Sequence, residues 1–315
     1  IVLFAAYRIG SRALNNNVLR GMAVLAFIAI FYFKIPFPYI VLAAGIIGYV
    51  GSHFAPEKFK AGGHHGDGKA SYGVAIIDDD TPPPEHTKFR WSRVLVFTLI
   101  GITIGGTVMA MLIQTYGWQG TLTQMGWFFT KAALVTFGGA YAVLPYVYQG
   151  GVDQYGWLTG TQMIDGLALG ETTPGPLIMV VAFVGFVGGW TKEIFGPDAL
   201  LLAGAAGASV ATIFTFLPSF LFILVGGPAV EATRDNIKFT APLTGITAAV
   251  VGVIINLAAF FAYHVLWPQG FEANFEWFAA FIGSAAFIAL FKFKVGIVPV
   301  IFVSAIAGLA YFLLT

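Results

Sequence analysis

Apolar segments long enough, or nearly long enough, to cross a lipid bilayer recur along most of this chain. A transmembrane helix needs about 20 apolar residues. Segments of this kind stand at 1–7, read as a truncated helix, at 21–33 and 36–52, read as a short hairpin, and at 94–115, 121–149, 163–190, 198–225, 240–262, 277–291 and 297–313. Only 10% of the residues are charged, whereas a soluble domain carries about 25%. The sequence therefore predicts an all-α polytopic membrane protein embedded in a lipid bilayer.

One polar stretch, residues 53–93, interrupts this pattern. It is rich in aspartate, glycine and proline, which is typical of a solvated linker. Its His64, His65 and Asp67, with His86 beyond, are metal-ligand types, but no helix fixes their geometry. We interpret the stretch as a linker and predict no metal site in it.

Several function classes lack their sequence signatures. The chain has no cysteine, which excludes disulfides, thiolate metal sites and cysteine nucleophiles. It contains no ATP-binding GxxxxGK[ST] loop, no G-x-S-x-G element and no HExxH element. A net charge of +1 gives no indication of nucleic-acid binding. The sequence therefore predicts no cofactor and no nucleic-acid partner.

An internal repeat links the two ends of the chain. The segment FIAIFYFKIPFPYIVLAAGIIG begins at Phe27, and FIALFKFKVGIVPVIFVSAIAG begins at Phe287. The alignment has no gap and matches Lys34 with Lys294. We interpret residues 1–52 as the tail of a first homologous half, 53–93 as a cytoplasmic linker and 94–315 as the second half. Because Ile1 stands inside an apolar run, we expect the chain to be a fragment.

The distribution of charge predicts how the halves are oriented. Three arginines follow the first apolar segment: Arg8, Arg12 and Arg20. Together with the basic linker they are expected in the cytoplasm, whereas the loop 264–276 has no Lys or Arg and is expected outside. With one crossing for each segment from 94 to 262, Lys34 lies outside and Lys294 inside. The fold expected is an inverted-repeat bundle with Gly/Pro-interrupted or re-entrant helices, a plan of secondary transporters.

The segment 163–190 is interrupted by a break that combines helix-breaking and polar residues, Glu171-Thr172-Thr173-Pro174-Gly175-Pro176. Unpaired backbone is costly in a bilayer, so such a break survives only where protein or a polar cavity surrounds it. A helix starting near Pro176 would present N–H groups to an oxyanion, and the two threonine hydroxyls can donate to it. Glu171 is expected to carry protons, because desolvation raises a carboxyl pKa. Asp165, nearer the expected cytoplasmic edge, is a candidate second relay or gate.

A second interrupted segment, residues 127–151, contains Gly138-Gly139 and Pro145. Lys131 lies seven residues before Gly138, on roughly the same helical face, and can add positive charge to an anion site. Structural interpretations stay open beside these. Glycine and proline also serve helix packing, Lys131 can snorkel to an interface, and Asp165 can be an ordinary interfacial residue.

At these residues the chain resembles the chromate ion transporter family. The resemblance rests on FTKAALVTFGGAYAVLPYV at 129–147, on YGWLTGTQMIDGLALGETTPGPLIMVVAFVGFVGGW at 155–190, and on the repeated tails. It implies a bacterial-type inner (plasma) membrane protein of two halves that exports chromate, with sulfate as the lookalike and with proton coupling. The family's motif positions carry over to Phe137, Gly138, Gly139, Asp165, Glu171, Thr172, Thr173, Pro174, Gly175 and Pro176. The first half's own copies of these motifs are absent from this chain.

The leading hypothesis is therefore a secondary transporter that exports chromate, with Lys131 and the motif residues binding substrate and with Glu171 and Asp165 moving protons. A carrier for sulfate or another anion is the first alternative. A channel or structural subunit is the second, and an enzyme with Glu171 and Asp165 as acid and base is the weakest. The sequence leaves transport direction, coupling ion and oligomeric state open.

Overall fold

The computed structural model describes residues 1–59, 90–136, 140–173, 176–227, 237–268, 270–272 and 274–314. All regular elements within these ranges are helical, which confirms the all-α prediction. They are α1 (Val2–Ala13), α2 (Asn17–Phe31), α3 (Phe37–Phe54), α4 (Pro56–Phe59), α5 (Trp91–Tyr116), α6 (Thr121–Leu134), α7 (Ala140–Tyr148), η1 (Gln149–Gln154), α8 (Gly160–Thr172), η2 (Leu177–Met179), α9 (Val180–Thr191), η3 (Pro197–Ala199), α10 (Leu200–Leu221), η4 (Phe222–Gly226), α12 (Ile237–Leu266), α13 (Trp277–Phe291) and α14 (Ile297–Leu314).

In the described part of the chain, five helical stretches are long and apolar enough to cross a membrane. They are Phe37–Phe54, Trp91–Tyr116, Pro197–Gly226, Thr240–Leu266 and Ile297–Leu314. The most apolar window of α12 is 67% buried inside the protein, whereas those of α5 and α14 are 6% buried. The helix α12 is therefore central, and α5 and α14 present their apolar surfaces outward. These helices confirm the polytopic prediction.

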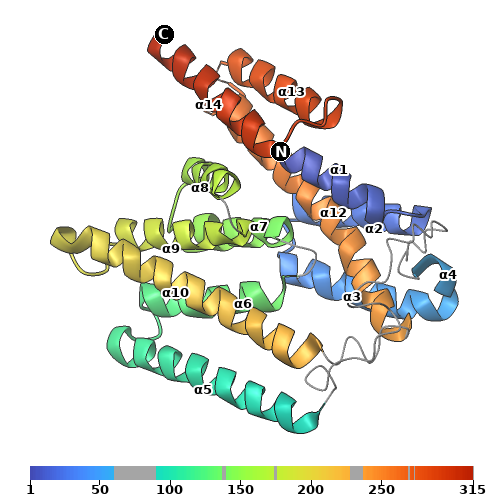
Figure 1. Ribbon diagram of the computed structural model, residues 1–315, viewed down its shortest axis with the longest axis vertical. Coiled ribbons are helices and arrows are strands. Elements are labelled where there is room, and N and C mark those ends of the chain that lie inside the picture. The colour runs from blue at the N-terminus through green and yellow to red at the C-terminus, as the bar shows by residue number, and fades with distance from the viewer. Residues whose placement is uncertain are drawn as a thin grey trace, which may run out of the picture.

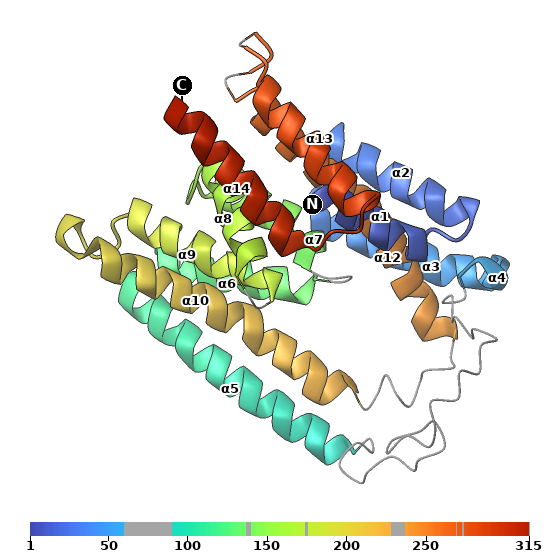
Figure 2. The same ribbon diagram turned by 45° about the horizontal axis from the view of Figure 1, so that its top comes forward.

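The helices form two groups. In one, α12 packs against α1, α2 and α3, and in the other, α10 packs against α9, α6 and α5. Figures 1 and 2 both show α5 and α10 side by side and α12 running between α1 and α3. The short helix α7 contacts α3 and α12 of the first group and α6 of the second, and so joins the groups.

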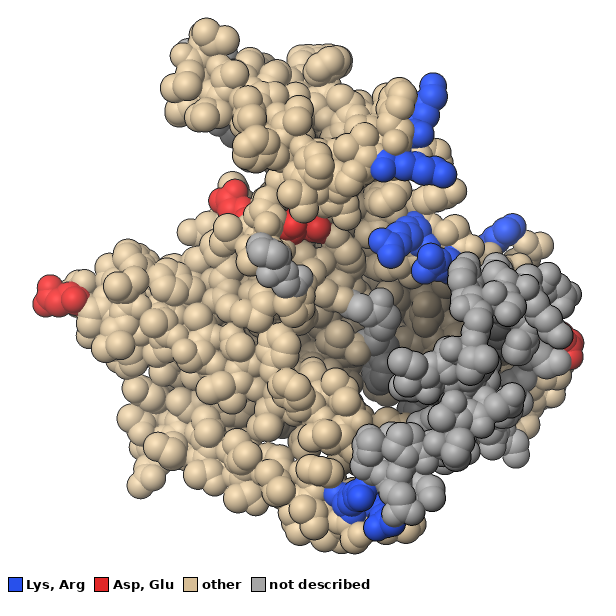
Figure 3. All heavy atoms as spheres, in the orientation of Figure 1, with Lys and Arg blue, Asp and Glu red and all other residues tan. Residues whose placement is uncertain are grey.

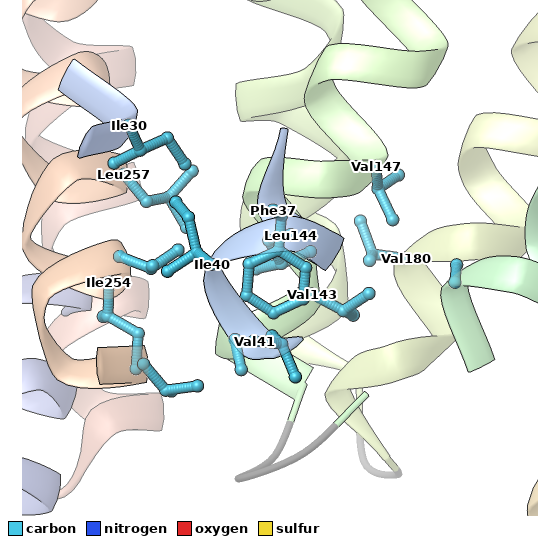
Figure 4. Close-up of a cluster of buried hydrophobic side chains, with 14 of the residues drawn as sticks. Ile30, Phe37, Ile40, Val41, Val143, Leu144, Val147, Val180, Ile254 and Leu257 are labelled. Carbon is cyan, nitrogen blue, oxygen red and sulfur yellow. The ribbon is translucent and has the colours of Figure 1, made fainter. Parts of the chain in front are cut away.

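The junction between the groups is filled by apolar side chains. Figure 4 shows Ile30 of α2, Phe37, Ile40 and Val41 of α3, Val143, Leu144 and Val147 of α7, Val180 of α9, and Ile254 and Leu257 of α12. All ten are buried. Lipid tails are as apolar as these side chains, so close packing holds helices together in a membrane.

Small residues allow the backbones of α9 and α10 to approach closely. A Cβ added at Gly185 would lie 2.4 Å from the carbonyl oxygen of Gly207, and one added at Gly207 would lie 2.1 Å from that of Gly185. Neither position can hold a larger side chain without moving one helix. The Gly185–Gly207 contact therefore fixes the position of α9 against α10.

The sequence repeat is also a structural repeat. The bounds of α13 and α14 are those of α2 and α3 shifted by 260 residues. Lys34 and Lys294 both adopt left-handed backbone, with φ of 54° and 52°, which is uncommon outside glycine. In the turns, the amides of Phe33 and Phe293 donate to equivalent carbonyls, each at 3.4 Å. The same turn is thus built twice, although the division of the chain into two halves stays a prediction.

The two repeated turns meet opposite ends of the segment formed by α7 and η1. Burial raises the pKa of Asp153 in η1, and the nearby charge of Lys34 opposes that rise. Ile297, which follows the other turn, lines a cavity with Tyr141 at the start of α7.

Basic residues lie in two places on the face shown in Figure 3. The visible Lys and Arg lie at the upper right, over α1 and the α13–α14 turn, and at the bottom, over the start of α5. Acidic side chains lie at the left edge, over the α9–α10 connection, near the centre and at the right edge. The basic residues of α1 and of the start of α5 are among those expected in the cytoplasm. The greater part of the predicted linker, including His64, His65 and His86, lies outside the described residues.

Candidate functional site: two helical hairpins that meet at their turns

The segment 121–149 folds back on itself. Phe128 of α6 stacks on Tyr146 of α7, with ring centroids 4.9 Å apart, and a Cβ added at Gly150 would lie 2.1 Å from the Phe128 ring. Phe128 lies 10 residues before Gly138, and Tyr146 and Gly150 lie 7 and 11 residues after Gly139, so the chain returns alongside α6. With 14 residues and a rise of about 1.5 Å per residue, α6 is about 21 Å long, short of the roughly 30 Å of a bilayer core. The segment is therefore a helical hairpin whose first helix is too short to cross the bilayer core.

The segment 163–190 makes a second hairpin around its own break. A Cβ added at Gly166 of α8 would lie 2.4 Å from the ring of Phe183 on α9, and one at Gly170 would contact Leu177 and Val180. A capping box starts α8, since the Thr159 hydroxyl accepts from the Gln162 amide and the Gln162 side chain accepts from the Thr159 amide.

The second turn follows from its prolines. Thr173 has φ −79° and ψ 126°, the extended backbone that a following proline favours. Pro176 is also extended, with φ −71° and ψ 127°. The helix expected to start near Pro176 begins as the three-residue η2 before α9.

Of the two arrangements that the sequence leaves open, crossing or re-entrant, the hairpin shape of both segments matches the re-entrant one. Both chain ends of a hairpin lie on the same side, so two hairpins replace two crossings. Because an even number of crossings is removed, the loop 264–276 stays on the side of the membrane where it was expected. Single-segment hydropathy cannot distinguish the two cases, because a re-entrant hairpin and a crossing helix are equally apolar.

The turns of the two hairpins are joined by one hydrogen bond. The hydroxyl of Tyr141, at the start of α7, donates to Oε1 of Glu171, at the end of α8. Both side chains are half-buried. The Glu171 carboxyl therefore lies where the two breaks meet. The adjacent Phe137, Gly138, Gly139, Pro174 and Gly175 lie outside the described residues.

Tyr141 also borders a cavity of about 470 Å³. Its polar lining consists of Arg8 and Arg12 of α1, Tyr141 of α7 and Thr247 of α12, and no carboxylate is among the described residues that line it. Arg8 is close enough to Tyr141 for its charge to act on the phenol. Figures 1 and 2 place α1 beside α12, with the start of α1 near the α13–α14 hairpin.

The electrostatics of this cavity favour an anion. Two guanidinium groups provide a formal charge of +2, and arginine binds oxyanions through paired N–H donors. Sequence reasoning assigned Arg8 and Arg12 to topology alone and did not single out Tyr141. The sequence did contain a signal for this site. Arg8 and Arg12 are four residues apart and therefore lie on one face of a helix, and the orientation of the helix in the membrane does not require the second arginine.

The threonine hydroxyls of the break donate to carbonyl groups of α8 in this structure. The Thr172 hydroxyl donates to the carbonyls of Ala168 and Leu169, at 3.1 and 3.0 Å. The Thr173 hydroxyl donates to Leu169 at 2.7 Å. Both donors are therefore used within α8, where they satisfy carbonyls that the end of the helix leaves open.

Two further candidates lie away from the junction. Lys131 is not among the residues lining the arginine cavity and faces a separate one, with its Nζ 5.6 Å from the centroid of the Trp127 ring. Asp165 is exposed and lies six residues before Glu171 on α8, so it is nearer the base of its hairpin than the turn. If the bases face outward, as the crossing count predicts, Asp165 is on the outer side of Glu171. Within the described residues, no group of three or more His, Asp or Glu side chains is placed to hold a metal.

Comparison with known proteins identifies the family. The family model described as chromate transporter matches residues 123–309. A chromate transport protein of Pseudomonas aeruginosa is 37% identical over 182 residues, which cover 56% of this chain and 39% of that protein. A chromate transport protein of Cupriavidus metallidurans is 35% identical over 143 residues, covering 45% and 32%. A probable chromate transport protein of Synechococcus elongatus is 31% identical over 172 residues, covering 55% and 39%.

The chain thus spans less than half the length of these relatives. No solved structure is significantly similar to it. The matched range begins in α6 and ends in α14, so it contains both hairpins and the Tyr141–Glu171 contact, while Arg8 and Arg12 precede it. Because the family model covers more than half of the chain, the chain belongs to the chromate transporter family.

Proposed function

We propose that this chain forms part of a secondary transporter that exports chromate across the inner membrane, with transport coupled to protons. The observation that carries the proposal is the hydrogen bond from Tyr141 to Glu171, which joins two re-entrant hairpins beside a cavity with two arginines. The names of the relatives support chromate as the substrate.

The substrate would be held by charge and by hydrogen bonds. Chromate is a tetrahedral dianion at neutral to alkaline pH, and the guanidinium groups of Arg8 and Arg12 match its charge. Each guanidinium can present two parallel N–H groups to two oxygens. Tyr141 borders the same cavity, and its hydroxyl can donate to one of the same oxygens.

Proton coupling would run through the single hydroxyl hydrogen of Tyr141. When Glu171 is ionised, it accepts this hydrogen, as in the structure. When Glu171 is protonated, it no longer requires the donor, and the hydroxyl can turn to an anion in the cavity. Because one O–H cannot serve both acceptors, proton binding at Glu171 and anion binding favour each other, and linkage makes the effect reciprocal.

Sulfate is the alternative substrate, and one observation favours it. The cavity offers guanidinium and hydroxyl groups, which recognise charge and oxygen geometry and not the central atom. Sulfate and chromate share both properties. Selectivity between them would then depend on size and on residues beyond this cavity.

The test is uptake of radiolabelled chromate into inverted membrane vesicles that contain the full-length protein. Export predicts uptake that saturates, depends on an imposed proton gradient and falls when sulfate is added. Vesicles without the protein give the background. No uptake above that background, with the protein present in the membrane, would overturn the proposal. Uptake of labelled sulfate that chromate does not inhibit would replace chromate by sulfate.

A further inference from the structure

A second polar cavity of about 270 Å³ lies at the base of the first hairpin. It is bordered by the α5–α6 turn, by one face of α6 and by the residues after η1. Its polar lining consists of Gln119, Thr123, Gln124, Lys131, Gln154 and Tyr155, and no carboxylate is among the described lining residues. None of these residues borders the arginine cavity.

Thr123 gives the cavity a buried polar group without a partner. Its side chain is 1% exposed, and its Oγ1 has no hydrogen-bond partner among the described residues. Helical threonines elsewhere in this protein donate to the carbonyl four residues earlier, as Thr130 and Thr215 do. Thr123 is the third residue of α6, so its i−4 residue lies outside the helix. Buried polar groups are nearly always paired. Thr123 borders the cavity, so a rotation of its side chain toward the cavity would let a bound ligand pair this hydroxyl.

The charge in the cavity comes from Lys131. Its Nζ lies 5.6 Å from the centroid of the Trp127 ring, a cation–π arrangement that holds the ammonium group against the cavity wall. An ammonium group presents three N–H donors, and a cation–π contact leaves donors for a ligand. If Lys131 only extended its ammonium group to the membrane interface, it would not need the glutamine amides and the threonine hydroxyl that border the same cavity.

The glutamines add neutral donors. The Gln124 amide nitrogen donates to the Gln119 side-chain oxygen at 3.0 Å. This bond occupies the Gln119 oxygen and leaves the Gln119 NH₂ group to donate elsewhere. Ammonium, hydroxyl and amide donors together, without an opposing carboxylate, fit a small oxyanion.

We propose that this cavity is a second oxyanion site, centred on Lys131 and Thr123 and separate from the arginine cavity. The proposal rests on the proposed function for the identity of its ligand, the transported tetrahedral anion. Because the cavity lies at the base of the hairpin and the Tyr141–Glu171 junction at its turn, the site would load or release the anion at the other end of the pathway.

The experiment measures equilibrium binding of radiolabelled chromate to the purified full-length protein in lipid nanodiscs. Lys131→Gln and Thr123→Val are compared with the unaltered protein and with Lys131→Arg, which keeps the charge. We expect Lys131→Gln to remove one bound chromate per chain and Lys131→Arg to retain it. Loss of one hydrogen bond predicts about fivefold weaker binding at this site for Thr123→Val.

Matched controls come from the same helix and the same residue types. Thr130→Val removes a hydroxyl that donates within α6, and Lys192→Gln removes an exposed lysine outside both cavities. Both controls should bind chromate as the unaltered protein does. If Lys131→Gln and Thr123→Val also do so, the second site is refuted.

This outcome is distinguishable from failure of the proposed function. In the full-length protein, Arg8→Gln should weaken the first site and leave the Lys131 site filled. A protein that binds chromate at Lys131 but transports none refutes the proposed function and keeps the second site. Transport with no binding change in Lys131→Gln and Thr123→Val refutes the second site alone.

Discussion

The Tyr141 hydroxyl and the Glu171 carboxylate, 30 residues apart in the sequence, form a hydrogen bond between the turns of two helical hairpins. Each residue stands beside a Gly- or Pro-containing break. The bond therefore places the Glu171 carboxyl where α7 begins and α8 ends. This relationship gives the breaks a mechanistic interpretation that neither has alone.

Replacing Glu171 by glutamine should remove the pH dependence of transport. Glutamine cannot ionise, but its side-chain oxygen can still accept from Tyr141, so the hairpins stay joined. The measurement is the initial rate of chromate uptake into inverted vesicles at a series of pH values. A pH profile identical to that of the unaltered protein would remove Glu171 from the proton pathway.

Tyr141→Phe should reduce transport by about tenfold or more, since a hydrogen bond to a charged group contributes about 1.5–3 kcal/mol. Phenylalanine keeps the ring packing and removes only the hydroxyl. If Tyr141 acts through Glu171, the double variant with Glu171→Gln should be no worse than the more impaired single variant. Additive losses would indicate that the two residues act independently.

Arg8→Gln should raise the half-saturating concentration of chromate by about 10- to 100-fold, because it removes a charged donor pair from the cavity. The matched control is Arg20→Gln. Arg20 is exposed, donates to the Leu14 carbonyl and the Asn17 side chain, and does not line the cavity. Equal effects of the two changes would indicate that only general surface charge matters.

Gly185→Ala should destabilise the protein by about 1–3 kcal/mol, because the added methyl group overlaps the backbone of α10. Gly106→Ala, in the middle of α5 with open space around its Cβ position, should be neutral or slightly stabilising, since alanine favours helix. Thermal unfolding of the detergent-solubilised proteins compares the two. Similar melting temperatures would show that α9 and α10 can separate without cost.

Cysteines placed at positions 34 and 294 should react from opposite sides of the membrane. Within this chain the background is clean, since it has no cysteine, and native cysteines in the rest of the protein would first be replaced. Labelling with a membrane-impermeant maleimide in right-side-out and inverted vesicles gives the sidedness of each position. Labelling of both from the same side would refute the inverted arrangement.

The sequence by itself determined the class of protein and much of its local structure. Apolar runs define helices in a membrane, because every backbone group must be paired within its own segment. The repeat was visible down to Lys34 and Lys294, whose backbone conformations prove equivalent. The positions of the breaks also followed from the sequence, since proline and glycine act through their own backbone.

Tertiary structure alone decided which side chains meet. Hydropathy measures a residue's preference for lipid and cannot distinguish a crossing segment from one that returns, so the sequence left both possibilities open for these two segments. Lys131 and the Glu171 break both attract attention in the sequence, yet Lys131 lies in another cavity. The arginines near Tyr141 come from α1, more than 120 residues earlier. Contacts at such separations leave no local pattern, because they depend on how α1, α7 and α12 pack and not on the propensities of any one segment.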